Sequence, residues 1–113
     1  MLRILYYPEG RGGPVAAHLQ RLSQERPKAA ARLSIDLEIL KTEGSRSPRI
    51  TVASFGGKLL ELKRLYDGIQ YRMFFVIWKG EAWLLHSIEK KSAKTPAGDL
   101  KIAYARLKAV TRR

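Results

Sequence analysis

The side chains of this chain that could do chemistry are mostly cations. Lys90, Lys91 and Lys94 crowd the short stretch EKKSAKTP, while Lys63 and Arg72 lie earlier in the sequence. Side chains of this kind bind phosphate groups and stabilise the negative charge that develops when a phosphate ester is cleaved. The alternative for the three clustered lysines is a solvated loop, which is a common position for lysine.

Arg72 interrupts the apolar segment QYRMFFVIW. A charge in such a segment must reach a partner or a cleft. The arginine fork suits a phosphate, which it can bind through two hydrogen bonds, and the alternative is a structural ion pair with Glu61. Lys63 shares a strand face with Glu61, whereas Arg64 points to the opposite face. Lys63 is therefore either a phosphate ligand or a solvated strand residue.

Candidates for proton transfer and base stacking complete the set. His86 ends the apolar segment WLLH, and its imidazole is chemically apt as an acid or base, although a structural role is the alternative. Repulsion between clustered cations also makes Lys91 or a neighbour a candidate proton-transfer group. Tyr71 and Tyr104 could stack on an unpaired base, with core packing as the alternative.

The charge balance of the chain favours an anionic partner. The 113 residues include 22 Lys and Arg against 10 Asp and Glu, a net charge of +12. Residues 1–57 hold nine cations and five acids (+4), and residues 58–113 hold thirteen and five (+8). Such a chain binds polyanions or an acidic protein, and its second half is the better place for the site. The absence of cysteine excludes disulfides, thiol nucleophiles and zinc–thiolate sites.

The sequence does not match the pattern of a secretory signal or of a membrane-spanning segment. The opening MLRILYYPEG is broken by Pro8 and Glu9 too early for a secretory signal, and no apolar run approaches membrane-spanning length. We therefore expect one soluble cytoplasmic domain over residues 1–113, with no membrane partner.

The first half of the chain predicts a strand followed by a helix hairpin. Residues 2–7 form an apolar strand, and Pro14 suits the first turn of a helix that ends at Pro27. A second helix then runs to Gly44. Residues 45–57 read as a loop that holds a small extended piece at 50–52.

The second half predicts a meander and a final helix. Strands over residues 59–66, 70–78 and 82–87 are separated by the turns DG and KG, and a polar connection follows over 88–95. Thr95 is expected to cap the last helix, with Pro96 at its first position. The fold class is thus α+β, in the order β-α-α-β-β-β-α, with a helix hairpin packed on an antiparallel sheet and a C-terminal helix.

Two blocks of sequence resemble a known family. GGKLLELKRLYDGIQYRMFF and, more specifically, LLHSIEKKSAKTPAGDLKIA are similar to the HigB-like, phage-derived branch of the RelE-type toxins, and the similarity extends over nearly the whole chain. Two positions depart from the family pattern. Lys63 stands where the family commonly has arginine, and Ser87-Ile88 replaces a glycine–aromatic pair.

The resemblance implies a RelE-like fold and a ribonuclease that stops translation by cutting messenger RNA, often on the ribosome. It implies neutralisation by a cognate antitoxin, usually a helix-turn-helix protein, and no metal or organic cofactor. Arg72, Lys63, Lys91 and His86 would then be catalytic. Arg64, Lys90, Lys94, Tyr71 and Tyr104 would bind RNA.

Two rival hypotheses remain. The chain could be a non-catalytic nucleic-acid-binding module on the same fold, which would bind RNA in a salt-dependent way without cutting it. Alternatively, its charge could serve mainly to bind an acidic protein, with no affinity for RNA.

Overall fold

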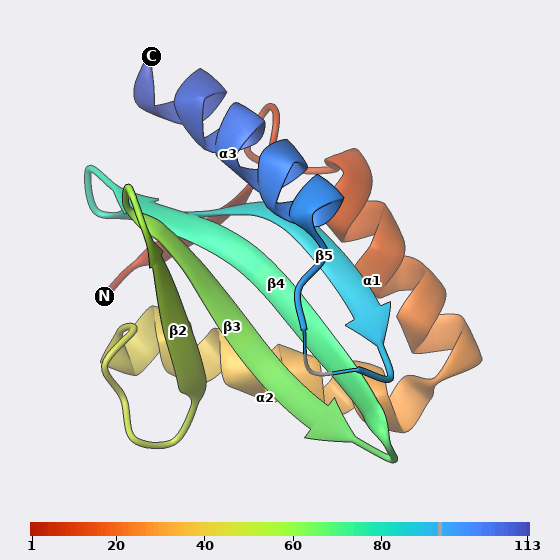
Figure 1. Cartoon of the computed structure of the whole chain (residues 1–113). Coiled ribbons are helices and arrows are strands. Elements are labelled where there is room, and N and C mark those ends of the chain that lie inside the picture. Colours follow the sequence, from red (N-terminus) through yellow and green to blue (C-terminus); the bar gives the residue numbers. More distant parts are fainter. Residues whose placement is uncertain (93) are drawn as a thin grey trace.

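The computed structural model describes residues 1–92 and 94–113. Within these residues, three helices pack around one five-stranded sheet (Figure 1). In chain order the elements are β1 (Arg3–Tyr6), α1 (Gly13–Glu25), α2 (Pro27–Glu43), β2 (Thr51–Gly56), β3 (Leu59–Tyr66), β4 (Ile69–Trp78), β5 (Glu81–Lys90) and α3 (Ala97–Thr111).

The sheet has the order β1-β5-β4-β3-β2. Strands β2 to β5 form an antiparallel meander, and β1 lies parallel to β5. The turns that join β3 to β4 and β4 to β5 are Asp67-Gly68 and Lys79-Gly80, and all four residues have left-handed φ angles between 52° and 78°. Two consecutive left-handed residues match the right-handed twist of a hairpin, so the predicted DG and KG turns are confirmed.

Helices cover both faces of the sheet (Figure 1). The hairpin of α1 and α2 packs on one face through a core that includes Leu33 and Met73, and α3 packs on the other through a core that includes Phe74 and Leu107. Strand β4 contributes buried side chains to both cores, which confirms its predicted central position. Helix α3 crosses one end of its face of the sheet and leaves the other end of that face without a helix (Figure 1).

The predicted α+β class and element order are confirmed, with differences in two places. The small extended piece expected at 50–52 belongs to a longer strand, β2, which takes six residues of the predicted loop, since Thr51 to Gly56 pair along β3 and gain a sheet partner for their backbone groups. Strand β5 also continues to Lys90, where a polar connection was expected, because its pairing with β4 extends as far as Gln70 and Lys90. The end of β5, Glu89-Lys90, is too polar to be recognised as a strand from its side chains alone.

Gly13 is required at the start of α1. Its φ is +84°, and a Cβ added there would lie 2.2 Å from the backbone oxygen of Tyr7. Gly12 also has a left-handed φ, +67°, but a Cβ there would meet nothing within 4 Å. Gly13→Ala is therefore expected to lower the free energy of unfolding by about 1–3 kcal/mol more than Gly12→Ala does, measured by urea denaturation. Equal losses would show that the close approach to Tyr7 is relieved without cost.

Candidate active site

A group of charged side chains lies on the sheet face that α3 leaves partly uncovered. Antiparallel pairing places Glu61 and Lys63 of β3 on the same face as Arg72 of β4, with Lys63 directly opposite Arg72. Arg72 Nη1 lies 3.6 Å from Glu61 Oε2, and Lys63 Nζ lies 3.8 Å from Glu61 Oε1. The ion pair between Arg72 and Glu61 that the sequence suggested is therefore present. We call this group, together with Thr95, the sheet-face cluster.

Thr95 closes over the sheet-face cluster instead of capping α3. Its hydroxyl accepts a hydrogen bond from Arg72 Nη1 and donates one to Glu61 Oε2 over 3.2 Å. The predicted cap is wrong: Pro96 occupies the N-cap position of α3, and no side chain caps this helix end. Arg72 and Glu61 are 3% and 0% exposed. Both form hydrogen bonds with the Thr95 hydroxyl, because a buried polar atom without a hydrogen-bond partner costs free energy.

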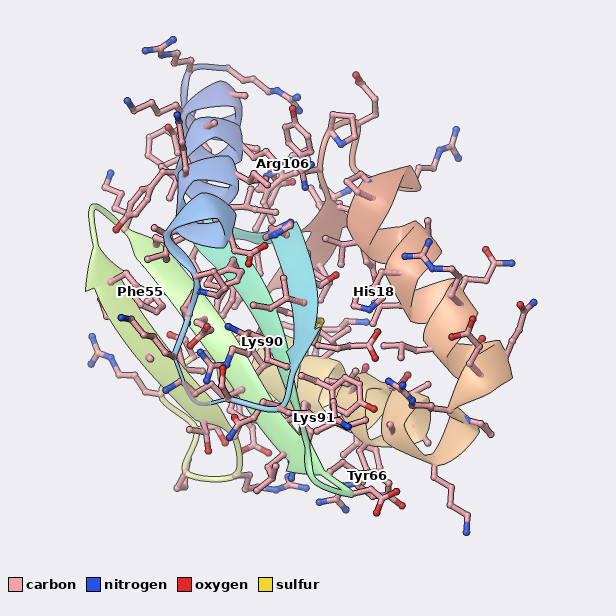
Figure 2. The ribbon with its side chains drawn as sticks, turned by 45° about the vertical axis from the view of Figure 1, so that its right-hand side comes forward. His18, Phe55, Tyr66, Lys90, Lys91 and Arg106 are labelled. Carbon is pink, nitrogen blue, oxygen red and sulfur yellow. The ribbon has the colours of Figure 1, made fainter. Side chains whose placement is uncertain are left out.

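The predicted lysines follow the end of β5. The side chains of Lys91 and Lys94 are exposed, while Lys90 Nζ donates a hydrogen bond over 2.7 Å to the backbone oxygen of Lys94. Figure 2 shows Lys90 and Lys91 beside the turn that leads from β5 back across the sheet. These cations lie close in sequence to Thr95, whose hydroxyl contacts Arg72 and Glu61.

His86 lies further along the same sheet face. It pairs with Phe74 across the sheet, and the two rings stack with centroids 6.0 Å apart. His86 Nε2 lies 2.7 Å from Asp99 Oδ1, in the first turn of α3. A carboxylate partner fixes the orientation of the imidazole, which suits a proton-transfer group.

Three predicted RNA ligands lie away from this cluster. Arg64 occupies the opposite sheet face, where its Nε and Nη2 donate to the Asp36 carboxylate over 2.7 and 2.6 Å. These hydrogen bonds and the charge of Asp36 raise the pKa of Arg64 against the effect of burial. Tyr71 is 2% exposed in the core beneath α1 and α2. The hydroxyl of Tyr104 lies 3.0 Å from the backbone oxygens of Phe55 and Gly56, so it ties α3 to β2.

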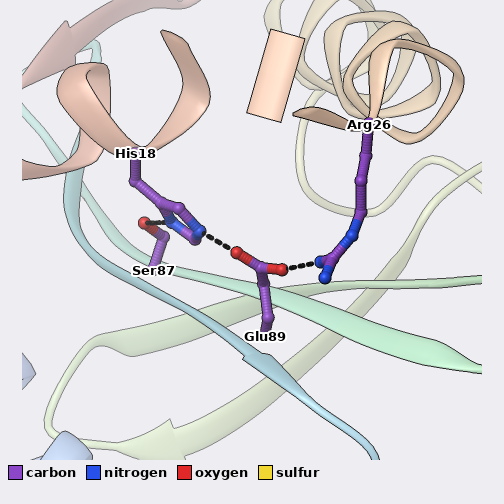
Figure 3. Close-up of polar contacts among 4 residues, drawn as sticks. All are labelled: His18, Arg26, Ser87 and Glu89. Carbon is purple, nitrogen blue, oxygen red and sulfur yellow. Dashed lines mark hydrogen bonds and ion pairs between the residues drawn. The ribbon is translucent and has the colours of Figure 1, made fainter. Parts of the chain in front are cut away.

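A second polar group joins α1 to β5, and sequence reasoning missed it. His18 Nδ1 lies 2.5 Å from Ser87 Oγ, and His18 Nε2 lies 2.6 Å from Glu89 Oε2 (Figure 3). The other oxygen of Glu89 accepts a hydrogen bond from Arg26. The hydrogen bond of Arg26 with Tyr71, and then the charge of Glu89, raise the pKa of Arg26.

His18, Ser87 and Glu89 of this group line a cleft of about 520 Å³ between α1, β5 and α3. We call it the edge cleft, because β1 pairs only with Glu81 to Leu84 and leaves the second half of β5 at the sheet edge. It is lined by Pro14, His18, Arg21, His86, Ser87, Ile88, Glu89, Lys90, Asp99 and Arg106. The sequence did carry one signal: His18 lies three residues after Val15 and four before Leu22, on the buried side of α1.

The fold and the sheet-face cluster together define a small α+β protein with a cationic surface suited to an anionic ligand. Residues 17–108 match the family model described as Phage derived protein Gp49-like (DUF891). The chain belongs to this family, a RelE- and HigB-like toxin family of toxin–antitoxin systems, which implies an antitoxin partner. No curated protein shows significant similarity to the chain. The predicted RelE-type family is thus confirmed, while the HigB branch stays a prediction.

Two further features of the structure concern membrane-spanning helices and groups of metal-binding side chains. Among the described residues, no helix is both long and apolar enough to cross a membrane. In the same part of the chain, no three His, Asp or Glu side chains lie together as a candidate metal site.

Proposed function

We propose that this chain is the toxin of a type II toxin–antitoxin system, related to HigB, and that it cleaves translated messenger RNA on the ribosome in the cytoplasm. Membership in the Gp49-like family is the observation that carries the proposal. The whole chain would act as one toxin domain, without a metal or organic cofactor. A helix-turn-helix antitoxin would hold it inactive.

The sheet-face cluster and the lysines beside it would bind the scissile phosphate. RNA cleavage of this kind requires three things: the 2′-hydroxyl loses a proton, the phosphate charge is stabilised, and the leaving 5′-oxygen gains a proton. Arg72 and Lys63 would stabilise the charge, since they lie across from each other on neighbouring strands. His86 or Lys91 would transfer protons, and Lys90 and Lys94 would hold the RNA backbone.

The burial of Arg72 supports one rival. With 3% of its surface exposed and its Nη1 beside Glu61 and Thr95, Arg72 binds a phosphate only if the chain around Thr95 moves. If the chain around Thr95 does not move, this protein would be the non-catalytic nucleic-acid-binding module of the rival hypothesis. This rival predicts salt-dependent RNA binding without new RNA ends.

Expression of the chain without an antitoxin is the direct test. We expect growth arrest, and we expect mapping of RNA 5′ ends to show new cuts within translated reading frames. Lys63→Met should reduce cleavage by about 100-fold, because one donor to the phosphate charge is lost. Lys108→Met is the matched control, since Lys108 is exposed on α3, away from the sheet-face cluster. Arrest without cleavage, or equal cleavage by both variants, would contradict the proposal.

A further inference from the structure

The group formed by Ser87, His18 and Glu89 has the geometry of an activated hydroxyl. Ser87 Oγ and His18 Nδ1 are separated by 2.5 Å, and His18 Nε2 and Glu89 Oε2 by 2.6 Å (Figure 3). In the tautomer with its proton on Nε2, His18 donates to Glu89 and accepts from the Ser87 hydroxyl. A base within hydrogen-bond reach of a hydroxyl, and itself oriented by a third group, is the arrangement that activates serine nucleophiles.

Neighbouring residues hold this arrangement in place. Arg26 binds the second oxygen of the Glu89 carboxylate, which fixes the orientation of the carboxylate toward His18. The side chain of His18 is 13% exposed, so its ring is largely fixed between α1 and β5, and Figure 2 shows it pointing from α1 toward the sheet. Ser87 is partly exposed and lines the edge cleft, so a ligand in that cleft can reach its hydroxyl.

The walls of the edge cleft indicate the chemical class of the ligand. Arg21, Lys90 and Arg106 line it together with two carboxylates, Glu89 and Asp99. Those carboxylates are bound by Arg26 and His86, so the three cations favour a substrate that carries negative charge and develops more of it during reaction. A cleft of about 520 Å³ has room for a small molecule. A small phosphate ester meets both conditions.

We propose that Ser87 is an activated nucleophile that forms a covalent bond with the phosphorus of small anionic phosphate esters. The Ser87 hydroxyl proton passes to His18 Nδ1 as the bond between Oγ and phosphorus forms. The bond between phosphorus and the leaving oxygen breaks, and that oxygen takes the proton from His18. Glu89 accepts the Nε2 hydrogen bond throughout and stabilises the imidazolium.

This activity uses a different nucleophile from the proposed RNA cleavage, although His86 and Lys90, which are assigned to that cleavage, also line the edge cleft. The substrate 2′-hydroxyl is the nucleophile in that reaction, so no protein nucleophile is needed. Ser87 also points to the sheet face opposite Arg72 and His86, because side chains alternate along β5. A failure of either proposal therefore leaves the other standing.

A fluorophosphonate probe tests the proposal on the purified full chain. It reacts by the same displacement, with fluoride as the leaving group, and leaves a stable phosphonyl adduct. We expect one adduct, located on Ser87 by peptide mass spectrometry. His18→Gln should slow its formation by at least about 100-fold, because the general base is lost. Ser34 is the internal control, since it is exposed on α2 and no described imidazole contacts it.

A pH profile and a second variant distinguish catalysis from a structural contact. The labelling rate of the unmodified chain should rise with pH through one ionisation, and that rise should vanish in His18→Gln. Glu89→Gln keeps the shape of the side chain and should slow labelling by about 10-fold or more, even if His18→Gln proves unstable. The proposal is overturned if Ser87 is not labelled, if it reacts no faster than Ser34, or if the pH profile is flat.

Discussion

Arg72→Ala is expected to abolish growth arrest and to reduce messenger RNA cleavage by about 100- to 1,000-fold, the usual effect of removing a group that stabilises transition-state charge. This expectation depends on the proposed ribonuclease activity. The same substitution removes the cation beside Glu61, which is 0% exposed. It should therefore also lower the free energy of unfolding by about 3–5 kcal/mol, because a buried carboxylate loses the nearer and more buried of its two cations and keeps only Lys63. Urea denaturation measures the second effect.

A double variant separates these two effects of Arg72. Arg72→Gln combined with Glu61→Gln removes both charges at once and leaves two amides that can bond each other and Thr95. We expect most of the lost stability to return, because neutral replacement of a buried ion pair costs little. Cleavage should stay low, since no cation remains opposite Lys63. A double variant as toxic as the unmodified chain would show that Arg72 acts only by pairing with Glu61.

Local sequence signals were sufficient for most of the fold. Hydrophobic periodicity and proline placed α1 and α2, and the left-handed turns at Asp67-Gly68 and Lys79-Gly80 joined the meander as expected. The errors lie where tertiary pairing outweighs local preference. Strand β2 exists because β3 offers it a partner, and the Thr95 hydroxyl binds buried charges elsewhere instead of the start of α3.

Only part of the candidate site could be predicted from the sequence, because its other contacts depend on tertiary packing. The polar contact between Arg72 and Glu61 could be anticipated, since a charge within an apolar strand needs a partner and strand alternation limits the choice. The contacts of His18 could not, because they join α1 to residues of β5 that are 69 and 71 positions away. The two histidines come from different elements, and only the packing of α1 and α3 along the β5 edge brings them into one cleft.

Arg64→Ala should lower the free energy of unfolding by about 3–5 kcal/mol, because it leaves a buried carboxylate without its partner. Asp36 is 1% exposed within the apolar side of α2, and Arg64 holds both of its oxygens. Arg32→Ala is the matched control, since Arg32 lies exposed on the same helix and should change stability by less than about 0.5 kcal/mol. Chemical denaturation of the three proteins measures the difference. A loss for Arg64→Ala no larger than the control would show that water replaces the pair without cost.

The stability lost in Arg64→Ala can be restored in a way that also tests its predicted role in RNA binding. Asp36→Leu added to Arg64→Ala removes the unpaired charge and continues the apolar surface formed by Leu33 and Leu40, so stability should recover. Arg64 faces α2, on the other side of the sheet from Arg72. The double variant should therefore cleave RNA at nearly the original rate. If it is stable but inactive, Arg64 contacts RNA as the sequence suggested, and its bond to Asp36 must open when RNA binds.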